Sequence, residues 1–227
     1  MYNHSLVIPC YNEALSLREL VQSLTKLVEE YNIQFILVNN GSTDNTTEIL
    51  SSIVNDHIVV VTLLQNQGYG GGIKAGLKLA SGEYIGWIHA DLQYSIEDVI
   101  RDLQFIGKTA DYIKGYRKKR DFSENIISLL MSCFESTLFT TKLFDINAQP
   151  TIFKKSFNQL VTNAPDDFTL DLYSYVLARR NKLLIKRFEV NFLKRLHGKS
   201  HWNNGIISVL RMIIKNLIYS FKLRSSI

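Results

Sequence analysis

The sequence predicts an α/β fold in which a mostly parallel central sheet carries helices on both faces. Apolar segments typical of strands fall near residues 5–9, 34–39, 58–64, 84–89 and 111–116. Segments typical of helices fall between them, near residues 13–30, 44–54, 70–80 and 95–107. Strands that alternate with helices along a chain form parallel sheets, because each crossover packs a helix onto a face of the sheet.

Length and linker pattern predict one large domain and a short tail. A chain of 227 residues is long enough for a single α/β domain with a substantial core. No internal repeat and no linker rich in Pro, Gly or Ser divides it. We therefore expect a domain over residues 1–200 and a tail over residues 201–227.

The first two predicted strands both end in polar turns. The first runs into Pro9-Cys10-Tyr11-Asn12-Glu13 and then into an amphipathic helix with leucines at helical spacing. The second, Gln34 to Val38, is followed by Asn39-Asn40-Gly41-Ser42-Thr43-Asp44. Ligands of open α/β sheets bind beyond the carboxyl ends of the strands. We expect these turns to lie side by side at one edge of the sheet, together with the end of strand 84–89.

The third predicted strand is followed by glycines that allow a second interpretation. Gly70-Gly71-Gly72-Ile73-Lys74-Ala75 fits the dinucleotide-binding pattern G-x-G-x-x-A, and Asp91 follows at a strand end about 20 residues later. An NAD-dependent oxidoreductase is therefore an alternative. Against it, these glycines follow the third strand instead of the first. The oxidoreductase interpretation also gives no role to the polar turns after the other strands.

The fourth predicted strand ends in His89-Ala90-Asp91-Leu92-Gln93. Carboxylate and amide oxygens are hard ligands, and at a strand end they suit Mg²⁺ or Mn²⁺ held against a phosphate. The alternative is that Asp91 caps the next helix, whose start Ser95-Ile96-Glu97-Asp98 is typical of a capping box.

Three segments together resemble the hallmarks of glycosyltransferase family 2: Val7–Glu13, Val38–Asp44 and His89–Gln93. Within this family of GT-A folds, the chain is most similar to polyprenyl-phosphate glycosyltransferases of the dolichyl-phosphate mannose synthase type, over roughly residues 5–200. The resemblance implies an inverting transfer of a hexosyl group from a nucleotide-diphosphate sugar to a membrane polyprenyl phosphate. It implies a donor half over about 1–120 and an acceptor half over about 121–200.

For the donor, the resemblance implies a nucleotide pocket and a metal site. The pocket residues are Pro9, Tyr11, Glu13, Asn40, Gly70, Lys74, Ala90 and Asp91. The metal, Mg²⁺ or Mn²⁺, is expected on Asp91 and Gln93, with His89 as a further candidate ligand. The chain departs from the family at two places, because Asn39-Asn40 replaces the usual Asp-Asp and His89 replaces the first acid of the metal motif. An amide both donates and accepts, so the base stays open between uracil, guanine and cytosine. Neutral His carries no carboxylate charge, so we expect a lower metal affinity.

For the acceptor, the resemblance implies a phosphate site and a candidate base. The phosphate ligands are Arg117, Gln149, Arg195 and Lys199, because an Arg fork bonds phosphate oxygens bidentately. A polyprenyl phosphate is already an anionic nucleophile, which the enzyme positions and screens. If the acceptor is instead a sugar hydroxyl of a lipid-linked glycan, Asp167 or Asp171 serves as the base. The expected catalytic residues are therefore Asp91, Arg117, Asp167, Asp171 and Arg195. The alternative for Asp166 and Asp167 is that they cap the helix that follows.

The net charge of +5 has a clear origin, since seven Lys and Arg residues and no acid follow Glu189. A second basic cluster spans Lys114–Arg120, where Lys118 and Lys119 fit a solvated face. Basic runs are common in nucleic-acid binders, but the chain shows no nucleic-acid-binding module. A phosphate-rich lipid or substrate explains the same charges, so we expect no nucleic-acid partner.

The segment Trp202–Arg224 alternates apolar residues with Arg211, Lys215 and Lys222, which interrupt any run long enough to span a membrane. This pattern predicts a helix lying in the plane of a membrane surface, and the alternative is a helix packed on the domain.

The chain starts without a signal peptide and has only two cysteines, of which Cys10 is expected to be a buried apolar residue. We therefore expect a cytoplasmic protein, peripheral on the inner face of the membrane. Its oligomeric state is not predicted. A catalytically inactive scaffold is the alternative that the losses at Asn39, Asn40 and His89 leave open.

Overall fold

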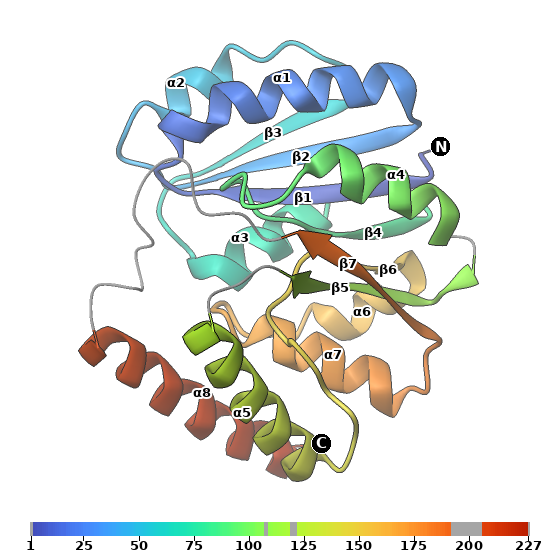
Figure 1. Ribbon diagram of the computed structural model, residues 1–227. Helices are drawn as coiled ribbons and strands as arrows, with labels where there is room; N and C mark the ends of the chain where they lie inside the picture. The colour runs from blue at the N-terminus through green and yellow to red at the C-terminus, as the bar shows by residue number, and fades with distance from the viewer. Residues whose placement is uncertain (1, 107–108, 119–121, 192–205, 227) are drawn as a thin grey trace.

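The structure, a computed structural model, describes residues 2–106, 109–118, 122–191 and 206–226. One seven-stranded sheet with the order β3-β2-β1-β4-β6-β5-β7 forms its centre (Figure 1). The strands are β1 His4–Cys10, β2 Ile33–Asn40, β3 Ile58–Leu63, β4 Tyr84–Trp87, β5 Tyr112–Lys118, β6 Thr151–Lys154 and β7 Ile185–Asn191. The α-helices are α1 Ala14–Glu30, α2 Thr46–Ser51, α3 Gly68–Leu77, α4 Ile96–Ile106, α5 Phe122–Phe139, α6 Asn158–Val161, α7 Leu170–Arg180 and α8 Ile206–Ser226; a short 3-10 helix spans Lys155–Phe157.

The predicted α/β architecture is confirmed. Strand β1 pairs in parallel with β2 and β4, and β2 pairs in parallel with β3. Strand β6 runs antiparallel between β4 and β5, and β5 pairs in parallel with β7. Strand β7 is absent from the predicted strands because Ile185-Lys186-Arg187-Phe188 has two charged residues in succession, which gives neither an apolar run nor a strict alternation.

The alternation of side chains along the strands divides the core into two layers. Leu6 and Ile8 point into the layer with α1, α2 and α4. Val7, between them in sequence, points into the layer with α3 and α7. Successive strand residues face opposite sides of a sheet, so both faces must be covered when all positions are apolar. This explains why the first two strands are buried along nearly their whole length.

Strand β4 and helix α2 are both shorter than predicted at the carboxyl edge of the sheet. Strand β4 stops at Trp87, because the backbone N–H of His89 donates to the Tyr94 hydroxyl at 2.6 Å and leaves the ladder. Helix α2 starts at Thr46, two residues later than predicted, because the Asp44 carboxylate accepts the Thr46 N–H at 3.0 Å in the turn before it. Polar turns thus follow β1, β2 and β4 together, as predicted.

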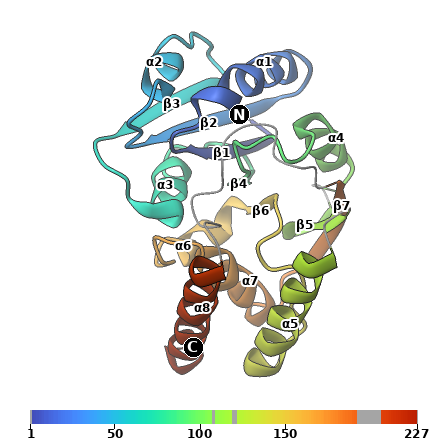
Figure 2. The ribbon, with the colours of Figure 1, turned by 60° about the vertical axis from the view of Figure 1, so that its left-hand side comes forward.

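Helices α5 and α8 project together from the end of the domain opposite α1 and α2 (Figure 2). The Ser220 hydroxyl donates to Glu135 Oε1 at 2.6 Å, and the rings of Phe134 and Phe221 meet edge to face. Leu223 is buried in the same contact. Across the part of the chain that the structure describes, no helix is long and apolar enough to cross a membrane.

Candidate active site

The turns after β1 and β2 form one rigid unit at the carboxyl edge of the sheet. Parallel pairing sets Cys10 opposite Asn39, so both chains leave the sheet at the same level. The Asn12 N–H then donates to Ser42 Oγ at 3.1 Å, and the Thr43 N–H donates to Asn12 Oδ1 at 2.8 Å. Asn12 has φ +57°, a left-handed conformation that Asn tolerates better than most residues.

The start of α1 is fixed to the same unit. The Glu13 N–H donates to Thr46 Oγ1 at 2.9 Å, and the Ala14 N–H donates to the Asp44 carboxylate at 3.2 Å. Of the predicted nucleotide residues in this region, Pro9, Tyr11 and Glu13 are partly exposed and border the edge of the sheet. They remain predicted nucleotide contacts.

The side chain of Asn40 points into the protein. It is almost fully buried, accepts the Gln67 N–H at 3.0 Å and donates to the Gly68 carbonyl at 2.9 Å. The neighbouring Asn39 donates to Thr47 Oγ1 at 2.8 Å and accepts the Ser42 N–H at 3.1 Å. An amide can satisfy a donor and an acceptor at once, whereas a carboxylate only accepts. Asn39 and Asn40, which replace the two acids usual in the family, therefore hold the loops at this edge of the sheet. Recognition of the base by Asn40 stays a prediction.

The glycines at the start of α3 pack against a loop of the acceptor half. The N–H groups of Gly70 and Gly71 both donate to the carbonyl of Asp166, at 2.8 and 3.2 Å. A Cβ at Gly70 would overlap the Pro165 carbonyl, so the close approach requires glycine. Lys74 donates to the Ala164 carbonyl at 2.6 Å and pairs with Asp166 at 2.8 Å. The first turn of α3 is thus capped by protein, and the donor contacts expected of Gly70 and Lys74 remain predictions.

The predicted metal residues follow β4 in one short loop. His89, Asp91 and Gln93 are all partly exposed, while Ala90 is buried. Asp91 does not cap α4, because the cap is Ser95, whose hydroxyl accepts the Asp98 N–H at 3.0 Å; Asp91 Oδ1 instead accepts the Gln93 N–H at 3.3 Å. Within the described residues no three His, Cys, Asp or Glu side chains gather in a metal-binding group.

This donor set still fits the expected ion. Mg²⁺ commonly binds to one or two carboxylates, with the remaining ligands from water and substrate phosphates. One carboxylate, one amide oxygen and one imidazole at a strand end suit a metal that arrives with a diphosphate better than a permanent metal centre. A resident site would need the closed set of protein ligands that the described residues do not form.

Asp171, a predicted base, lies at the centre of a buried polar cluster. Its Oδ1 accepts from Lys114 Nζ at 3.3 Å and from Thr151 Oγ1 at 3.2 Å. Gln149 Nε2 lies 3.2 and 3.3 Å from its two oxygens. Lys114 is fully buried, and burial lowers its pKa to about 8 although Asp171 acts to raise it. Asp171 is thus held by protein donors and has almost no contact with solvent.

Asp167, the other predicted base, is about one-third exposed. Its Oδ2 pairs with Lys215 of α8 at 2.8 Å, and its Oδ1 accepts the N–H and hydroxyl of Thr169. Burial acts to raise the pKa of Asp167, but the hydrogen bonds from Lys215 and Thr169 outweigh it and the pKa is lowered. The bond to the Thr169 N–H forms a turn before α7, whose N-cap is Thr169 without a side-chain cap, so Asp167 does not cap this helix as the alternative held. Asp167 also links the acceptor half to α8.

Of the predicted phosphate ligands, Arg117 and Gln149 are described, whereas Arg195 and Lys199 lie outside the described residues. The Arg117 guanidinium bonds both oxygens of Asp145, and its own backbone N–H also donates to that carboxylate at 2.7 Å. A carboxylate thus occupies the fork that was expected to hold phosphate. The structure orients Arg117, and its contact with an acceptor stays a prediction.

A family model described as Glycosyl transferase family 2 matches residues 5–166, which is more than half of the chain. The chain belongs to glycosyl transferase family 2. The match includes all three strand-end turns and reaches the loop that contacts the glycines of α3. This membership excludes the oxidoreductase alternative that the glycine pattern had left open.

Curated relatives in this family are polyprenyl-phosphate sugar transferases. The undecaprenyl-phosphate 4-deoxy-4-formamido-L-arabinose transferases of Yersinia pestis (strain Pestoides F) and Yersinia pseudotuberculosis serotype O:3 (strain YPIII) are each 37% identical to the chain over 126 residues. The aligned part covers 52% of this chain and 38% of each relative. The chain therefore matches much less than two thirds of the length of these relatives.

Solved structures confirm the GT-A fold. Glucosyl-3-phosphoglycerate synthase from Mycobacterium tuberculosis, in complex with Mn²⁺, UDP and glucosyl-3-phosphoglycerate, superimposes with a TM-score of 0.76 at 16% identity. The superposition covers 100% of this chain and 81% of that one. The complex of the same enzyme with Mn²⁺, UDP and phosphoglyceric acid gives 0.74 at 18% identity, over 98% and 78% of the two chains.

Four residues of this family 2 site were missed in the sequence. Tyr69, Asp145 and Thr151 carried no pattern that distinguishes them from ordinary loop and strand residues. Lys114 did carry a signal, because it occupies a strand position two after the buried Tyr112 and therefore shares its face. Counting it within the basic cluster Lys114–Arg120 was wrong for the binding of phosphate, since its side chain has no exposed surface.

Proposed function

We propose that the protein is an inverting, metal-dependent glycosyltransferase that transfers a hexosyl group from a nucleotide-diphosphate sugar to a polyprenyl phosphate at a membrane surface. The observation that carries the proposal is the convergence of the turns after β1, β2 and β4 at one sheet edge, with the Asp91 carboxylate partly exposed there. Polyprenyl phosphate as acceptor is supported by the Yersinia relatives, which are named undecaprenyl-phosphate transferases.

The donor would bind across this edge. Pro9, Tyr11 and Glu13 would contact the nucleoside, while Asp91 and Gln93 would hold Mg²⁺ or Mn²⁺ with the diphosphate. The bound metal would supply positive charge that stabilises the diphosphate as it leaves. The Mn²⁺ and UDP in the structures of the mycobacterial enzyme support a donor of this class.

The acceptor phosphate would attack the anomeric carbon from the face opposite the diphosphate. Neither predicted base is placed to collect a proton easily, because Asp171 is paired with buried Lys114 and Asp167 with Lys215. A phosphate nucleophile needs no such proton transfer, since it is already anionic. What it needs is orientation and screening, for which Arg117 is held in place by Asp145 at the end of β5, and Arg195 and Lys199 are the further candidates.

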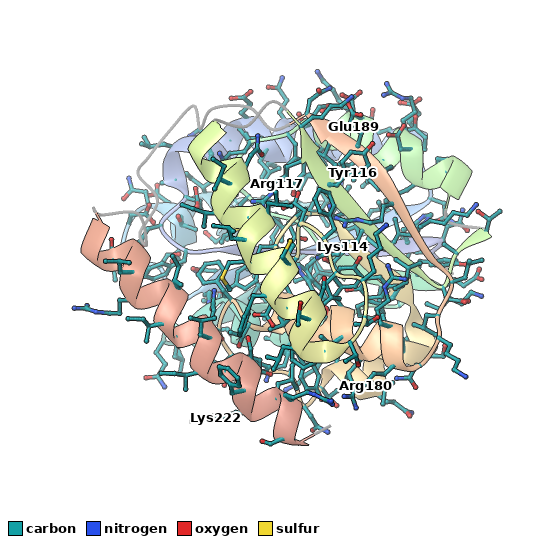
Figure 3. All side chains as sticks on the ribbon, turned by 60° about the horizontal axis from the view of Figure 1, so that its bottom comes forward. Lys114, Tyr116, Arg117, Arg180, Glu189 and Lys222 are labelled. Atoms are coloured by element: carbon teal, nitrogen blue, oxygen red, sulfur yellow. The ribbon has the colours of Figure 1, made fainter. Side chains whose placement is uncertain are left out.

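The exposed face of α8 supports a membrane surface as partner. Leu210, Ile214, Ile218 and Phe221 are each more than half exposed. They recur at intervals of three and four residues and so form one stripe, beside which Arg211 and Lys222 are also exposed. Figure 3 shows α5 and α8 nearest the viewer, with Lys222 on α8 at the periphery. An apolar stripe beside basic residues, without acids, suits an anionic bilayer surface. We place this surface on the cytoplasmic side, as the sequence predicts.

Calorimetry tests the donor half of the proposal. The purified protein is titrated with UDP, GDP and CDP, each with and without Mn²⁺, and one nucleotide is expected to bind only with the metal. Asp91→Asn should abolish this dependence, whereas Asp98→Asn, which removes an exposed carboxylate from α4, should leave it unchanged. Absence of metal-dependent binding to any nucleotide would favour the inactive scaffold. Transfer from the matching nucleotide sugar to undecaprenyl phosphate then tests the acceptor.

A further inference from the structure

Tyr69 joins the donor half to the acceptor half. It is the second residue of α3, and its ring stacks on His89 with centroids 5.5 Å apart and planes inclined by 25°. The other neighbour is Phe168, with centroids 4.5 Å apart and planes inclined by 14°. The side chain thus lies between the metal-motif loop after β4 and the loop before α7.

The Tyr69 hydroxyl contacts three polar groups. Gln149 Nε2 donates to it at 2.9 Å, and it donates to Asp171 Oδ2 at 3.3 Å. The third group is His89 Nε2, at 3.4 Å. Through this one oxygen, His89 is connected to the buried pair of Asp171 and Lys114.

The number of protons determines which way each bond runs. Asp171 accepts from Lys114 and Thr151, as an ionised carboxylate does, and such a carboxylate cannot donate. The single hydroxyl proton of Tyr69 must therefore point to Asp171. Its lone pairs remain as acceptors for Gln149 and for His89. The contact with His89 is then a hydrogen bond only if the imidazole carries its proton on Nε2, which leaves the lone pair of the neutral ring on Nδ1.

We propose that Tyr69 is a positioning residue that fixes both the ring plane and the tautomer of His89. His89 stands where family members usually have the first acid of the metal motif, so this chain would use a tyrosine to hold the replacement. With its plane and tautomer fixed, the imidazole would meet the donor in one defined orientation, as a metal ligand or as a partner of a ribose hydroxyl. The consequence for the donor rests on the proposed function, whereas the state of the imidazole does not.

Nitrogen NMR of the histidine side chains tests the state of the imidazole directly. The signals of His89 are identified by their loss in His89→Ala. In the wild type above pH 8, we expect a neutral ring with Nε2 protonated. Tyr69→Phe keeps the stacking ring and removes the hydroxyl, and should move both nitrogen shifts towards the averaged values of a free imidazole. An unchanged His89 spectrum in Tyr69→Phe would overturn the proposal.

Tyr84→Phe is the matched control. The Tyr84 hydroxyl is also buried and hydrogen-bonded, to the Ala110 carbonyl at 3.0 Å, but Tyr84 stands at the start of β4, whereas His89 follows the end of that strand. This variant should leave the His89 signals as they are in the wild type. If it shifts them as much as Tyr69→Phe does, the effect is general loosening of the fold and the assignment to Tyr69 is wrong.

A double-mutant cycle tests the consequence for the donor. Loss of one hydrogen bond corresponds to about a fivefold change in affinity, so Tyr69→Phe should weaken Mn²⁺-dependent nucleotide binding by about that factor. In the His89→Ala background the same change should have no further effect, because Tyr69 acts through His89. Equal effects in both backgrounds would contradict the proposal. If the wild type binds no nucleotide, the proposed function fails, and the nitrogen spectra still decide the role of Tyr69.

Discussion

Lys114 Nζ lies 3.3 Å from Asp171 Oδ1, and both side chains are almost completely buried. The ammonium also donates to the Thr151 hydroxyl and the Ala148 carbonyl, at 2.8 and 3.1 Å. The pair thus joins β5 to the first turn of α7 and to the segment before β6. A buried pair with this many partners therefore holds these three segments together.

Lys114→Met should destabilise the fold strongly. The substitution leaves the Asp171 carboxylate buried without its cation, and breaking a buried pair on one side costs about 3–5 kcal/mol. Urea unfolding followed by circular dichroism measures the change. The control is Lys118→Met on the same strand, where Lys118 is exposed and its partner Glu189 is about one-third exposed. Equal stability of Lys114→Met and wild type would show that the pair is not formed.

Glu135 should make the fold less stable as the pH rises from about 4.5 to about 7. Burial between α5 and α8 raises its pKa from 4.5 to about 7, although the hydrogen bond from Ser220 acts to lower it. In this window the folded protein binds a proton that the unfolded chain does not, so stability is lost as the pH increases. The loss should amount to about 3–4 kcal/mol at most, since each pKa unit corresponds to about 1.4 kcal/mol.

Glu135→Gln tests this directly, because an amide has no charge to bury. The difference in unfolding free energy between wild type and variant should change with pH over the window and be constant above about pH 8. Taking a difference removes the opposite contribution of His4, whose pKa burial lowers to about 4. Glu97→Gln, which removes an exposed carboxylate from α4, is the matched control. A flat difference for Glu135→Gln would refute the assignment.

Gly76→Ala should destabilise the protein by about 1–3 kcal/mol, the usual range for overpacking a core. Helix α3 lies so close to β1 and β2 that a Cβ at Gly76 would overlap Val7 and come within 2.9 Å of Val38. Alanine otherwise favours helices over glycine by about 1 kcal/mol. Thermal unfolding of Gly76→Ala measures the net of these two opposing effects, and we expect overpacking to outweigh helix propensity. A stabilised Gly76→Ala would mean that α3 has room to move away.

The parts of the fold that follow from local sequence were predictable. Strands β1 and β2 are buried on both faces, so their sequences are apolar runs. The polar turns after them could be placed side by side, because neighbouring parallel strands end at the same edge of the sheet. The partners of the site residues were not predictable in this way. Asp171 meets Lys114 across 57 residues, and Asn40 meets the Gly68 carbonyl across 28. Nothing local distinguishes a buried Lys from an exposed one until the strand register is known.

The acceptor class can be decided by comparing two substitutions. If the acceptor is a lipid phosphate, Arg195→Ala should reduce kcat/KM far more than Asp167→Asn, because the nucleophile needs screening and no proton transfer. If the acceptor is a sugar hydroxyl, Asp167→Asn should cost about a hundredfold or more, the usual scale of general-base catalysis. Rates are measured with Mn²⁺ and the matching nucleotide sugar, once with undecaprenyl phosphate and once with a lipid-linked glycan as acceptor. An inactive Asp167→Asn beside an active Arg195→Ala would reject the phosphate acceptor.

The exposed stripe on α8 predicts how the protein meets a bilayer. Ile214→Asp combined with Ile218→Asp should weaken binding to vesicles that contain phosphatidylglycerol by about tenfold or more, because two apolar contacts of about 1–2 kcal/mol each are lost. Both side chains are more than half exposed, so the fold should be retained. Co-sedimentation measures the bound fraction, and higher salt should reduce it through Arg211 and Lys222.

The control places the same change elsewhere on the surface. Val54 follows α2 and Leu64 follows β3, and both are almost completely exposed, so Val54→Asp with Leu64→Asp adds the same two charges away from α8. This variant should bind vesicles nearly as well as the wild type, with only the small electrostatic loss that two added negative charges cause. Equal loss in the two variants would mean that net charge alone governs binding. In that case α8 is a helix of the folded domain, tied by Lys215 to Asp167 and by Ser220 to Glu135, and has no separate role at the membrane.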